Sequence, residues 1–250
     1  MFVQLYRIIL YGVSTYNLIE QGVFIIRKIF FDTETSGLDC FDCKIIELAM
    51  VIVENGKIIE KYDEFINIEE PISPRVIELT GITNEMLKSE GKDEKTVAND
   101  LKERITDDTL MIAHNCQFDL LFVYQLLKRN FPEEADDIIL NLKWLDTLTV
   151  LKDRMSYPHR LNNAVEHYNV EKVNFHRAVD DTKALYYVTL AMKEERDDLA
   201  EYINVFGYNP KYGVSGPRLP IIKYKPQRFR YRIVPQDEIL PRISSDKRIW

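Results

Sequence analysis

The sequence lacks several features that define specialised classes of protein. Three cysteines in 250 residues are too few for a disulfide framework, so we expect a reducing, cytoplasmic location. No apolar run is long enough to cross a bilayer, because Gln4 and Arg7 interrupt the apolar residues 1–13, and we expect no membrane partner. The net charge of −7 argues against a general nucleic-acid coat protein, which would normally be basic. No internal repeat is present.

The spacing of the cysteines also argues against a zinc site. Cys40 and Cys43 form a single C-x-x-C pair in a segment that we expect to be a loop, and Cys116 is far from them in the chain. A structural zinc site would need a second pair of Cys or His ligands at similar spacing. We therefore expect two reduced loop cysteines.

Charge and proline divide the chain unevenly. Residues 208–250 hold ten Lys and Arg, three Asp and Glu, and six of the ten prolines, so their net charge is +7 and that of the first 207 residues is −14. We predict an N-terminal extension of unknown role (1–23), one domain (24–207), and a basic tail rich in proline and aromatic residues (208–250). Because the apolar periodicity lies upstream, we expect the chain to fold without that tail.

The pattern of apolar residues predicts an α/β domain. The apolar run Ile25–Phe31 predicts a strand that ends in Asp32, and further strands are expected at Ile45–Val53, Ile58–Ile66, Thr109–Ala113 and Leu142–Leu145. Asn55-Gly56 predicts a hairpin between the second and third strands. Helices are expected from Pro74 through Leu79 and at Phe118–Lys128, Thr147–Lys152, Leu161–Tyr168 and Ala178–Lys193. Three antiparallel strands followed by strand–helix alternation indicate a mixed β-sheet of about five strands flanked by α-helices.

Three acidic motifs carry the chemistry. They are Asp32-Thr33-Glu34-Thr35, His114-Asn115-Cys116-Gln117-Phe118-Asp119 and His176-Arg177-Ala178-Val179-Asp180-Asp181. Each has an ordinary explanation alone, such as a charged strand end or a carboxylate that stabilises a helix N-terminus. Together they supply four carboxylates and an imidazole. Clustered carboxylates repel one another, so a fold that gathers them usually binds cations, and carboxylates around two divalent ions suit phosphodiester hydrolysis.

The expected elements bring these carboxylates together. Asp32 and Glu34 are two residues apart at a strand end, so both side chains leave one face of the sheet. Asp119 lies in the first turn of a helix that follows a strand. Asp180 and Asp181 are adjacent on a helix, where successive side chains diverge by about 100°, so only one can enter a given site, and the spacing from His176 favours Asp181.

The combination resembles the DEDDh branch of the DnaQ-like 3′–5′ exonucleases, which belong to the RNase H-like superfamily and include proofreading subunits of bacterial DNA polymerase III. The segment from Phe31 to Leu38 is similar to the first family motif, His114 to Asp119 to the second, and His176 to Asp181 to the third. Leu79-Thr80-Gly81-Ile82-Thr83 is similar to a family segment that borders the terminal nucleotide. The resemblance covers about residues 24–200.

The resemblance implies a fold, a cofactor and a set of site residues. It implies an RNase H-like sheet and two divalent cations, Mg²⁺ or Mn²⁺, with Asp32, Glu34, Asp119 and Asp181 as ligands and Asp32 as the ligand shared by both ions. These four residues and His176 would be catalytic, and His176 would be the general base that deprotonates the attacking water. The implied nucleotide-binding residues are Thr35, Ser36, Gly37, Leu38, Ile82, His114, Asn115 and Phe118.

The function expected from this resemblance is a 3′–5′ exonuclease that releases nucleoside 5′-monophosphates from single-stranded or frayed 3′ ends of DNA, in proofreading or in repair. It would act alone or serve a DNA polymerase subunit in trans. Two alternatives stay open: an exoribonuclease that trims RNA ends, and a catalytically silent nucleic-acid-binding module. Complete motifs weigh against the second.

The tail allows two interpretations. Aromatic residues alternate there with cations, a composition that can stack bases and contact phosphates: Tyr224, Phe229 and Tyr231 with Lys223, Lys225, Arg228, Arg230 and Arg232. The same composition also suits a solvated linker or an arm packed on its own domain.

Overall fold

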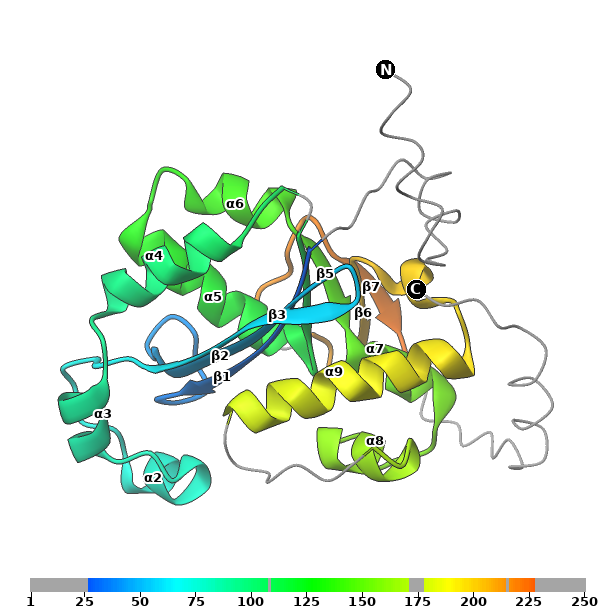
Figure 1. Ribbon diagram of the computed structural model, residues 1–250, viewed down its shortest axis with the longest axis horizontal. Helices are drawn as coiled ribbons and strands as arrows, with labels where there is room; N and C mark the ends of the chain where they lie inside the picture. Colours follow the sequence, from blue (N-terminus) through cyan, green and yellow to red (C-terminus); the bar gives the residue numbers. More distant parts are fainter. Residues whose placement is uncertain (1–26, 108, 171–177, 215, 228–250) are drawn as a thin grey trace.

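The computed structural model describes residues 27–107, 109–170, 178–214 and 216–227 (Figure 1). The N-terminal extension, His176 and residues 228–250 lie outside this described part. The strands are β1 (Arg27–Thr35), β2 (Ile45–Glu54), β3 (Lys57–Phe65), β4 (Thr109–Ala113), β5 (Lys143–Asp146), β6 (Val205–Tyr208) and β7 (Lys223–Pro226). The helices are α2 (Pro74–Thr80), α3 (Asn84–Glu90), α4 (Glu94–Arg104), α5 (Cys116–Asn130), α6 (Ala135–Asn141), α7 (Thr147–Arg154), α8 (Leu161–His167), α9 (Ala178–Glu195) and the 3-10 helix η2 (Leu199–Tyr202).

A five-stranded mixed sheet forms the centre of the fold, as predicted. Its strand order is β3-β2-β1-β4-β5, in which β1, β2 and β3 are antiparallel and β1, β4 and β5 are parallel. The hairpin between β2 and β3 turns at Asn55 and Gly56, with φ values of 50° and 74°. Both values lie in the left-handed region that a two-residue hairpin turn requires, which explains why this dipeptide marks the turn.

Helices cover both faces of the sheet. Because side chains alternate along a strand, Phe31 faces a core formed with α4, α5 and α6, whereas Phe30 faces a second core formed with α7, α8 and α9. Figure 1 shows these two groups of helices on opposite sides of the sheet. In the described residues, no helix is both long and apolar enough to span a membrane.

The boundaries of β1 differ from the expected ones in a way that affects the site. The apolar run predicted a strand that ends in Asp32, but β1 continues through Glu34 to Thr35. Residues 31–35 remain paired with β2. The parallel pairing with β4 covers only Arg27–Phe30, so the last part of β1 extends beyond its neighbour on that side.

Three helices of the first core were not expected from the sequence, namely α3, α4 and α6. In α4 the buried residues are Val97, Ala98 and Leu101. Three apolar residues among many charged ones do not form a pattern from which a helix can be predicted. The start of α4 is defined by Asp93, whose carboxylate accepts a hydrogen bond from the backbone of Thr96. These helices are thus specified by capping and tertiary packing more than by periodicity.

The first part of the basic tail packs on the domain. Strands β6 and β7 pair in parallel, and Asn204, just before β6, exchanges two hydrogen bonds with Trp144 of β5. Phe206 and Ile222 are buried in the first core. The amide of Gln227 donates to the carbonyl of Thr149 at 2.7 Å. We call residues 208–227 the arm. Its extended, irregular path explains why the sequence showed no period there.

This packing argues against the expectation that the chain folds without residues 208–250. Ending the chain after Gly207 would remove Ile222 and uncover Phe206, and burial of one such side chain contributes about 1.5–3 kcal/mol. We expect this truncation to lower the melting temperature by about 10 °C. Thermal unfolding monitored by circular dichroism checks it. A matched truncation after Gln227 should change the melting temperature little, and equal melting of the two truncated chains would contradict the packing role of the arm.

Candidate active site

The end of β1 presents two carboxylates from one face of the sheet. Asp32 and Glu34 point towards the side covered by α9, and Thr33, between them, points towards α5. Because β4 has already ended beside Phe30, this end of β1 is not covered by a parallel neighbour. The expected shared face for Asp32 and Glu34 at the end of this strand is therefore present.

Asp119 approaches the same strand end from α5. It lies in the first turn of that helix and is only 4% exposed. Its Oδ1 atom accepts two hydrogen bonds from Thr33, one from the backbone N–H at 3.1 Å and one from the hydroxyl at 2.7 Å. Thr33 thus ties Asp119 to the two carboxylates of β1.

The electrostatics indicate that the carboxylates are close together. Burial, followed by the charges of Asp119, Glu34, Asp181 and Glu47, raises the pKa of Asp32 well above its usual value. Burial and then Asp181 raise the pKa of Glu34 to about 7. Burial likewise raises the pKa of Asp119 to about 7, against the hydrogen bonds from Thr33, which favour the ionised form. Carboxylates from β1, β2, α5 and α9 therefore share one electrostatic environment.

The start of α9 distinguishes its two adjacent aspartates. The charge of Asp181 raises the pKa values of both Asp32 and Glu34. Asp180 instead forms an ion pair with Lys183 at 2.7 Å along the same helix. Asp181 therefore belongs to the carboxylate cluster, and Asp180 lies on its flank.

Glu47 is a fifth carboxylate, which the sequence analysis did not select. It lies directly opposite Glu34 in the antiparallel pairing of β1 with β2, so the two side chains share a face, and it is only 3% exposed. Its charge contributes to the raised pKa of Asp32. The available signal was a single charged residue inside the otherwise apolar run Ile45–Val53.

The donor set fits divalent cations in its chemistry. Mg²⁺ and Mn²⁺ prefer carboxylate oxygens, and a cation would offset the repulsion that raises these pKa values. Among the described residues, however, no group of three or more His, Cys, Asp or Glu side chains is arranged to hold a metal ion. His176 lies outside the described residues. The assignment of Asp32, Glu34, Asp119 and Asp181 as ligands therefore remains a prediction.

The loop after β1 holds the first group of expected nucleotide-binding residues. The hydroxyl of Thr35 donates to the carbonyl of Gly37 at 2.6 Å, and Ser36 exchanges two hydrogen bonds with Lys44 across the loop. A Cβ atom on Gly37 would lie 2.5 Å from the sulfur of Cys43, so a larger residue here would displace the Cys43 side chain. Leu38 is 87% exposed at the tip. Hydrogen bonds thus shape the loop and leave Leu38 accessible to a ligand.

The second group of expected nucleotide-binding residues, at the turn from β4 to α5, is already engaged within the protein. His114 has Nδ1 3.0 Å from the hydroxyl oxygen of Thr147 and Nε2 2.8 Å from the carbonyl oxygen of His159. Burial lowers the pKa of His114, which favours the neutral ring. Asn115 adopts a left-handed conformation with φ of 72°. Because both ring nitrogens of His114 have partners, only its ring face remains for a nucleotide.

Phe118 and Ile82 complete the expected nucleotide-binding set. Phe118 is half-buried and packs against Phe122, with ring centroids 4.9 Å apart. Ile82 is buried and follows Gly81, which ends α2 with φ of 72°, as the sequence predicted. Whether these residues bind a nucleotide stays a prediction.

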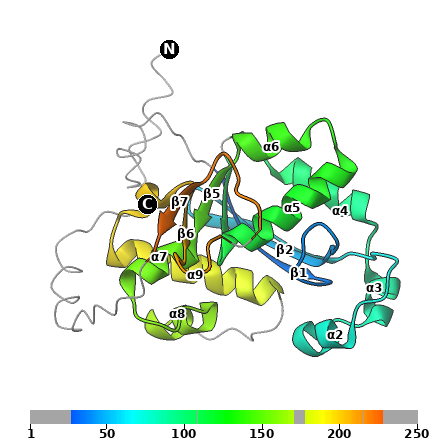
Figure 2. The same ribbon diagram turned by 180° about the vertical axis from the view of Figure 1, so that it is seen from behind.

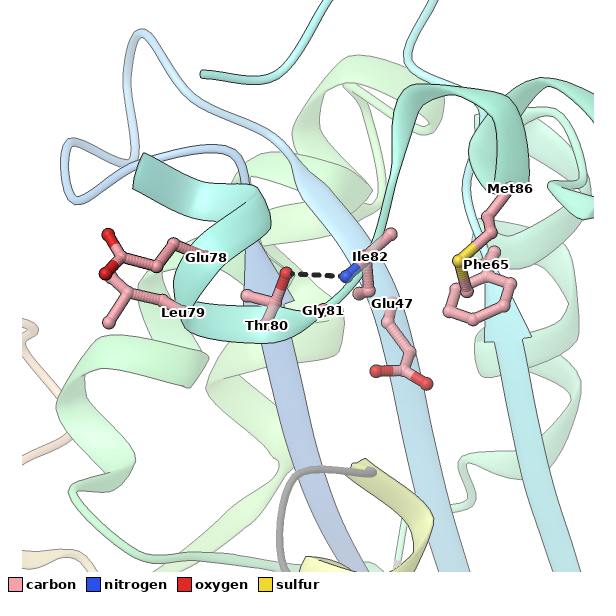
Figure 3. Close-up of a pocket in the computed structure, with 8 residues that line it drawn as sticks. All are labelled: Glu47, Phe65, Glu78, Leu79, Thr80, Gly81, Ile82 and Met86. Carbon is pink, nitrogen blue, oxygen red and sulfur yellow. Dashed lines mark hydrogen bonds between the residues drawn. The ribbon is translucent and has the colours of Figure 1, made fainter. Parts of the chain in front are cut away.

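A pocket of about 400 Å³ has Glu47 of the carboxylate cluster in its wall (Figure 3). It is lined by Glu47, Phe65, Glu78, Leu79, Thr80, Gly81, Ile82 and Met86. The hydroxyl of Thr80 accepts a hydrogen bond from the backbone N–H of Ile82 at 3.1 Å, which fixes the turn that forms one wall. Glu47 lies between this turn and Phe65 in the view. Since Glu47 is also opposite Glu34, the pocket adjoins the carboxylate cluster.

Comparison with known proteins agrees with this architecture. The sequence model of the family described as exonuclease matches residues 29–189. The chain therefore belongs to this exonuclease family, as a DnaQ-like exonuclease of the RNase H-like superfamily.

Among similar sequences, PolC-type DNA polymerase III of Bacillus subtilis is 36% identical over 187 residues, and that of Latilactobacillus sakei is 31% identical over 221 residues. These matches cover 73% and 83% of this chain but only 12% and 15% of the two polymerases. The chain thus corresponds to a small part of each relative.

Among solved structures, the zinc-bound complex of Escherichia coli exonuclease I with single-stranded DNA superposes with a TM-score of 0.63 at 20% identity, covering 72% of this chain and 43% of that protein. At this identity the likeness supports the fold alone. It confirms the RNase H-like mixed sheet expected from the motifs.

Proposed function

We propose that this chain is a metal-dependent 3′–5′ exonuclease that releases nucleoside 5′-monophosphates from the 3′ ends of DNA. The main supporting observation is the convergence of carboxylates from β1, β2, α5 and α9, one of which, Glu47, also lines a pocket. Membership of the exonuclease family supports the activity, and the similarity to PolC-type polymerases supports DNA as substrate.

In the proposed mechanism Asp32, Glu34, Asp119 and Asp181 would hold two divalent cations, Mg²⁺ or Mn²⁺. The bound cations would neutralise charge on the scissile phosphate and favour ionisation of the attacking water. Thr33 keeps the Asp119 carboxylate next to β1 through its two hydrogen bonds. The hydrophobic wall of the pocket, which includes Ile82 and Phe65, would hold the last nucleotide and limit access of bulk water. His176 accepts the proton of the attacking water at an imidazole nitrogen.

The biological setting that we propose is proofreading for a DNA polymerase. The relatives with 31–36% identity are PolC-type replicative polymerases, and this chain spans only 12–15% of their length. We propose only the exonuclease activity for this chain, because the matched segment is a small part of those polymerases. Action on its own, in repair, is the alternative setting, and a cytoplasmic location is consistent with either.

Matched DNA and RNA oligonucleotides of one sequence test the substrate class. Each would carry a 5′ label, and digestion would be followed with Mg²⁺, with Mn²⁺ and with EDTA. We expect single-nucleotide shortening of DNA with either metal, nucleoside 5′-monophosphates as products, and no reaction in EDTA. Faster degradation of RNA than of DNA would replace the proposal by the exoribonuclease alternative, and binding without degradation of either would support the silent module.

A further inference from the structure

The arm carries positive charge that the rest of the described protein does not neutralise. Lys225 forms an ion pair with Asp153. Within the described ranges, no ion pair engages Lys211, Arg218 or Lys223, which lie on the surface of the arm. This contrasts with the domain, in which, for example, Arg104 pairs with Glu60 and Arg129 with Glu94. Since residues 1–207 carry a net charge of −14, the arm is a local exception in an acidic protein.

Two tyrosine rings hold Arg218 in position. The guanidinium carbon lies 5.8 Å from the ring centroid of Tyr208 and 5.5 Å from that of Tyr224. Both distances fall within the range of a cation–π interaction. The planar fork of a guanidinium matches the oxygens of a phosphate. Because Arg218 is exposed, its guanidinium is accessible to such an anion.

Hydrogen bonds attach the neighbours of Arg218 to the helix that carries Asp119. The hydroxyl of Tyr224 donates to Oε1 of Gln117 at 2.9 Å, and the amide of Gln117 donates to the carbonyl of Pro217 at 2.9 Å. Gln117 lies in the first turn of α5, two residues before Asp119, which is about 3 Å along the helix axis. Figure 2 shows the orange arm beside α5. The arm is thus fixed to the same helical turn as a proposed metal ligand.

The arm also exposes an aromatic surface. Tyr212 is 75% exposed, and Nζ of Lys211 lies 5.0 Å from its ring centroid. Exposed aromatic rings next to cations provide stacking platforms for unpaired bases, and every base has a face that can stack. The arm therefore offers cations that can contact the phosphates of a single strand and aromatic rings that can stack on its bases.

We propose that the arm extends the substrate path of the exonuclease. Arg218 binds a backbone phosphate of a single strand upstream of the 3′ end, and Tyr212 stacks on one of its bases. The ligand is single-stranded DNA, and the inference rests on the proposed function because the 3′ end of the same strand occupies the carboxylate site. The positive arm offsets the repulsion between the strand and the acidic domain.

Oligonucleotides of increasing length test this path. Full-length wild type, Arg218→Gln and the control Lys57→Gln would be compared on oligothymidylates of 2 to 20 nucleotides. Lys57 is an exposed residue of the β2–β3 hairpin. It pairs with Glu54, at the other end of β2 from Glu47. We expect Arg218→Gln to raise KM about tenfold for the 20-mer, to leave KM for the dinucleotide and kcat unchanged, and to reduce the slope of affinity against salt by about one. Lys57→Gln should change none of these.

Binding in EDTA separates this inference from the proposed function. Fluorescence anisotropy with labelled oligothymidylate 20-mer should show weaker binding by Arg218→Gln whether or not the protein hydrolyses DNA. Tyr212→Ala should weaken binding about tenfold, and Tyr187→Ala, which removes a half-exposed tyrosine from α9, should not. Equal affinity of Arg218→Gln and wild type for the 20-mer would overturn the inference, as would an equal loss on the dinucleotide. If the protein did not hydrolyse DNA but Arg218→Gln and Tyr212→Ala still bound the 20-mer more weakly than wild type, only the proposed function would be contradicted.

Discussion

Replacing Asp32 by asparagine is expected to lower turnover by at least about 10³-fold and yet leave the metal-free protein at least as stable as wild type. The loss of turnover follows from the proposed role of Asp32 as the ligand shared by both cations, a major electrostatic contribution to the reaction. The stability follows from the raised pKa of Asp32, since burial and four neighbouring carboxylates make its charged form unfavourable. Asparagine has a similar shape without the charge.

Melting curves with EDTA and with Mg²⁺ or Mn²⁺ check this prediction. A cation that binds only the folded protein stabilises it by mass action, so the melting temperature of wild type should rise with metal concentration. The melting temperature of Asp32→Asn should rise much less with metal concentration. Asp180→Asn is a matched control, because Asp180 is paired with Lys183 on the flank of the cluster. If Asp32→Asn gained as much from metal as wild type does, Asp32 would not be a ligand.

The pH dependence of stability provides a second readout for the same cluster. The pKa values of Glu34 and Asp119 are raised to about 7, so the folded protein holds more protons than the unfolded chain between about pH 4 and 7. The stabilisation is complete below about pH 4 and is lost as the pH rises through 7. In EDTA, wild type should therefore melt at a lower temperature at pH 8 than at pH 6, and the difference should be smaller in Asp32→Asn.

His176→Ala is the second substitution for which we expect a large effect. If the imidazole is the general base, turnover should fall by roughly 10²–10⁴-fold while affinity for DNA stays nearly unchanged. The wild-type rate should also fall at acid pH as His176 becomes protonated. Rate measurements at saturating substrate, together with binding in EDTA, separate the two quantities. His167→Ala removes a histidine from α8 and is the matched control. Equal rates for wild type and His176→Ala would exclude the role of general base.

The sequence predicted most of the sheet because local chemistry and tertiary structure agree there. Asn55-Gly56 forms the turn that its backbone preferences favour, and Gly81 ends α2 in the left-handed conformation. The alternation of Phe30 and Phe31 between two cores follows directly from the pleat of a strand. The first carboxylate pair was found for the same reason, since a two-residue spacing on a strand fixes a shared face.

The features that the sequence did not predict depend on contacts between distant segments. Glu47 joins the carboxylate cluster only because β2 pairs with β1 in the register that places it opposite Glu34. The arm has no periodicity, and its position depends on hydrogen bonds to Asn204, Gln117 and Thr149, which lie outside it. The ring of His114 faces Thr147 and a backbone carbonyl, a geometry that no motif spacing can reveal.

One digestion tests the central claim that this carboxylate cluster removes nucleotides from a 3′ terminus. Three single-stranded DNAs of one sequence would be incubated with the protein and Mg²⁺ or Mn²⁺: a linear strand with a 3′-hydroxyl, the same strand with a 3′-phosphate, and a closed circle. The account predicts stepwise release of nucleoside 5′-monophosphates from the first, and little or no reaction of the other two. Cleavage of the circle into linear fragments would contradict the account.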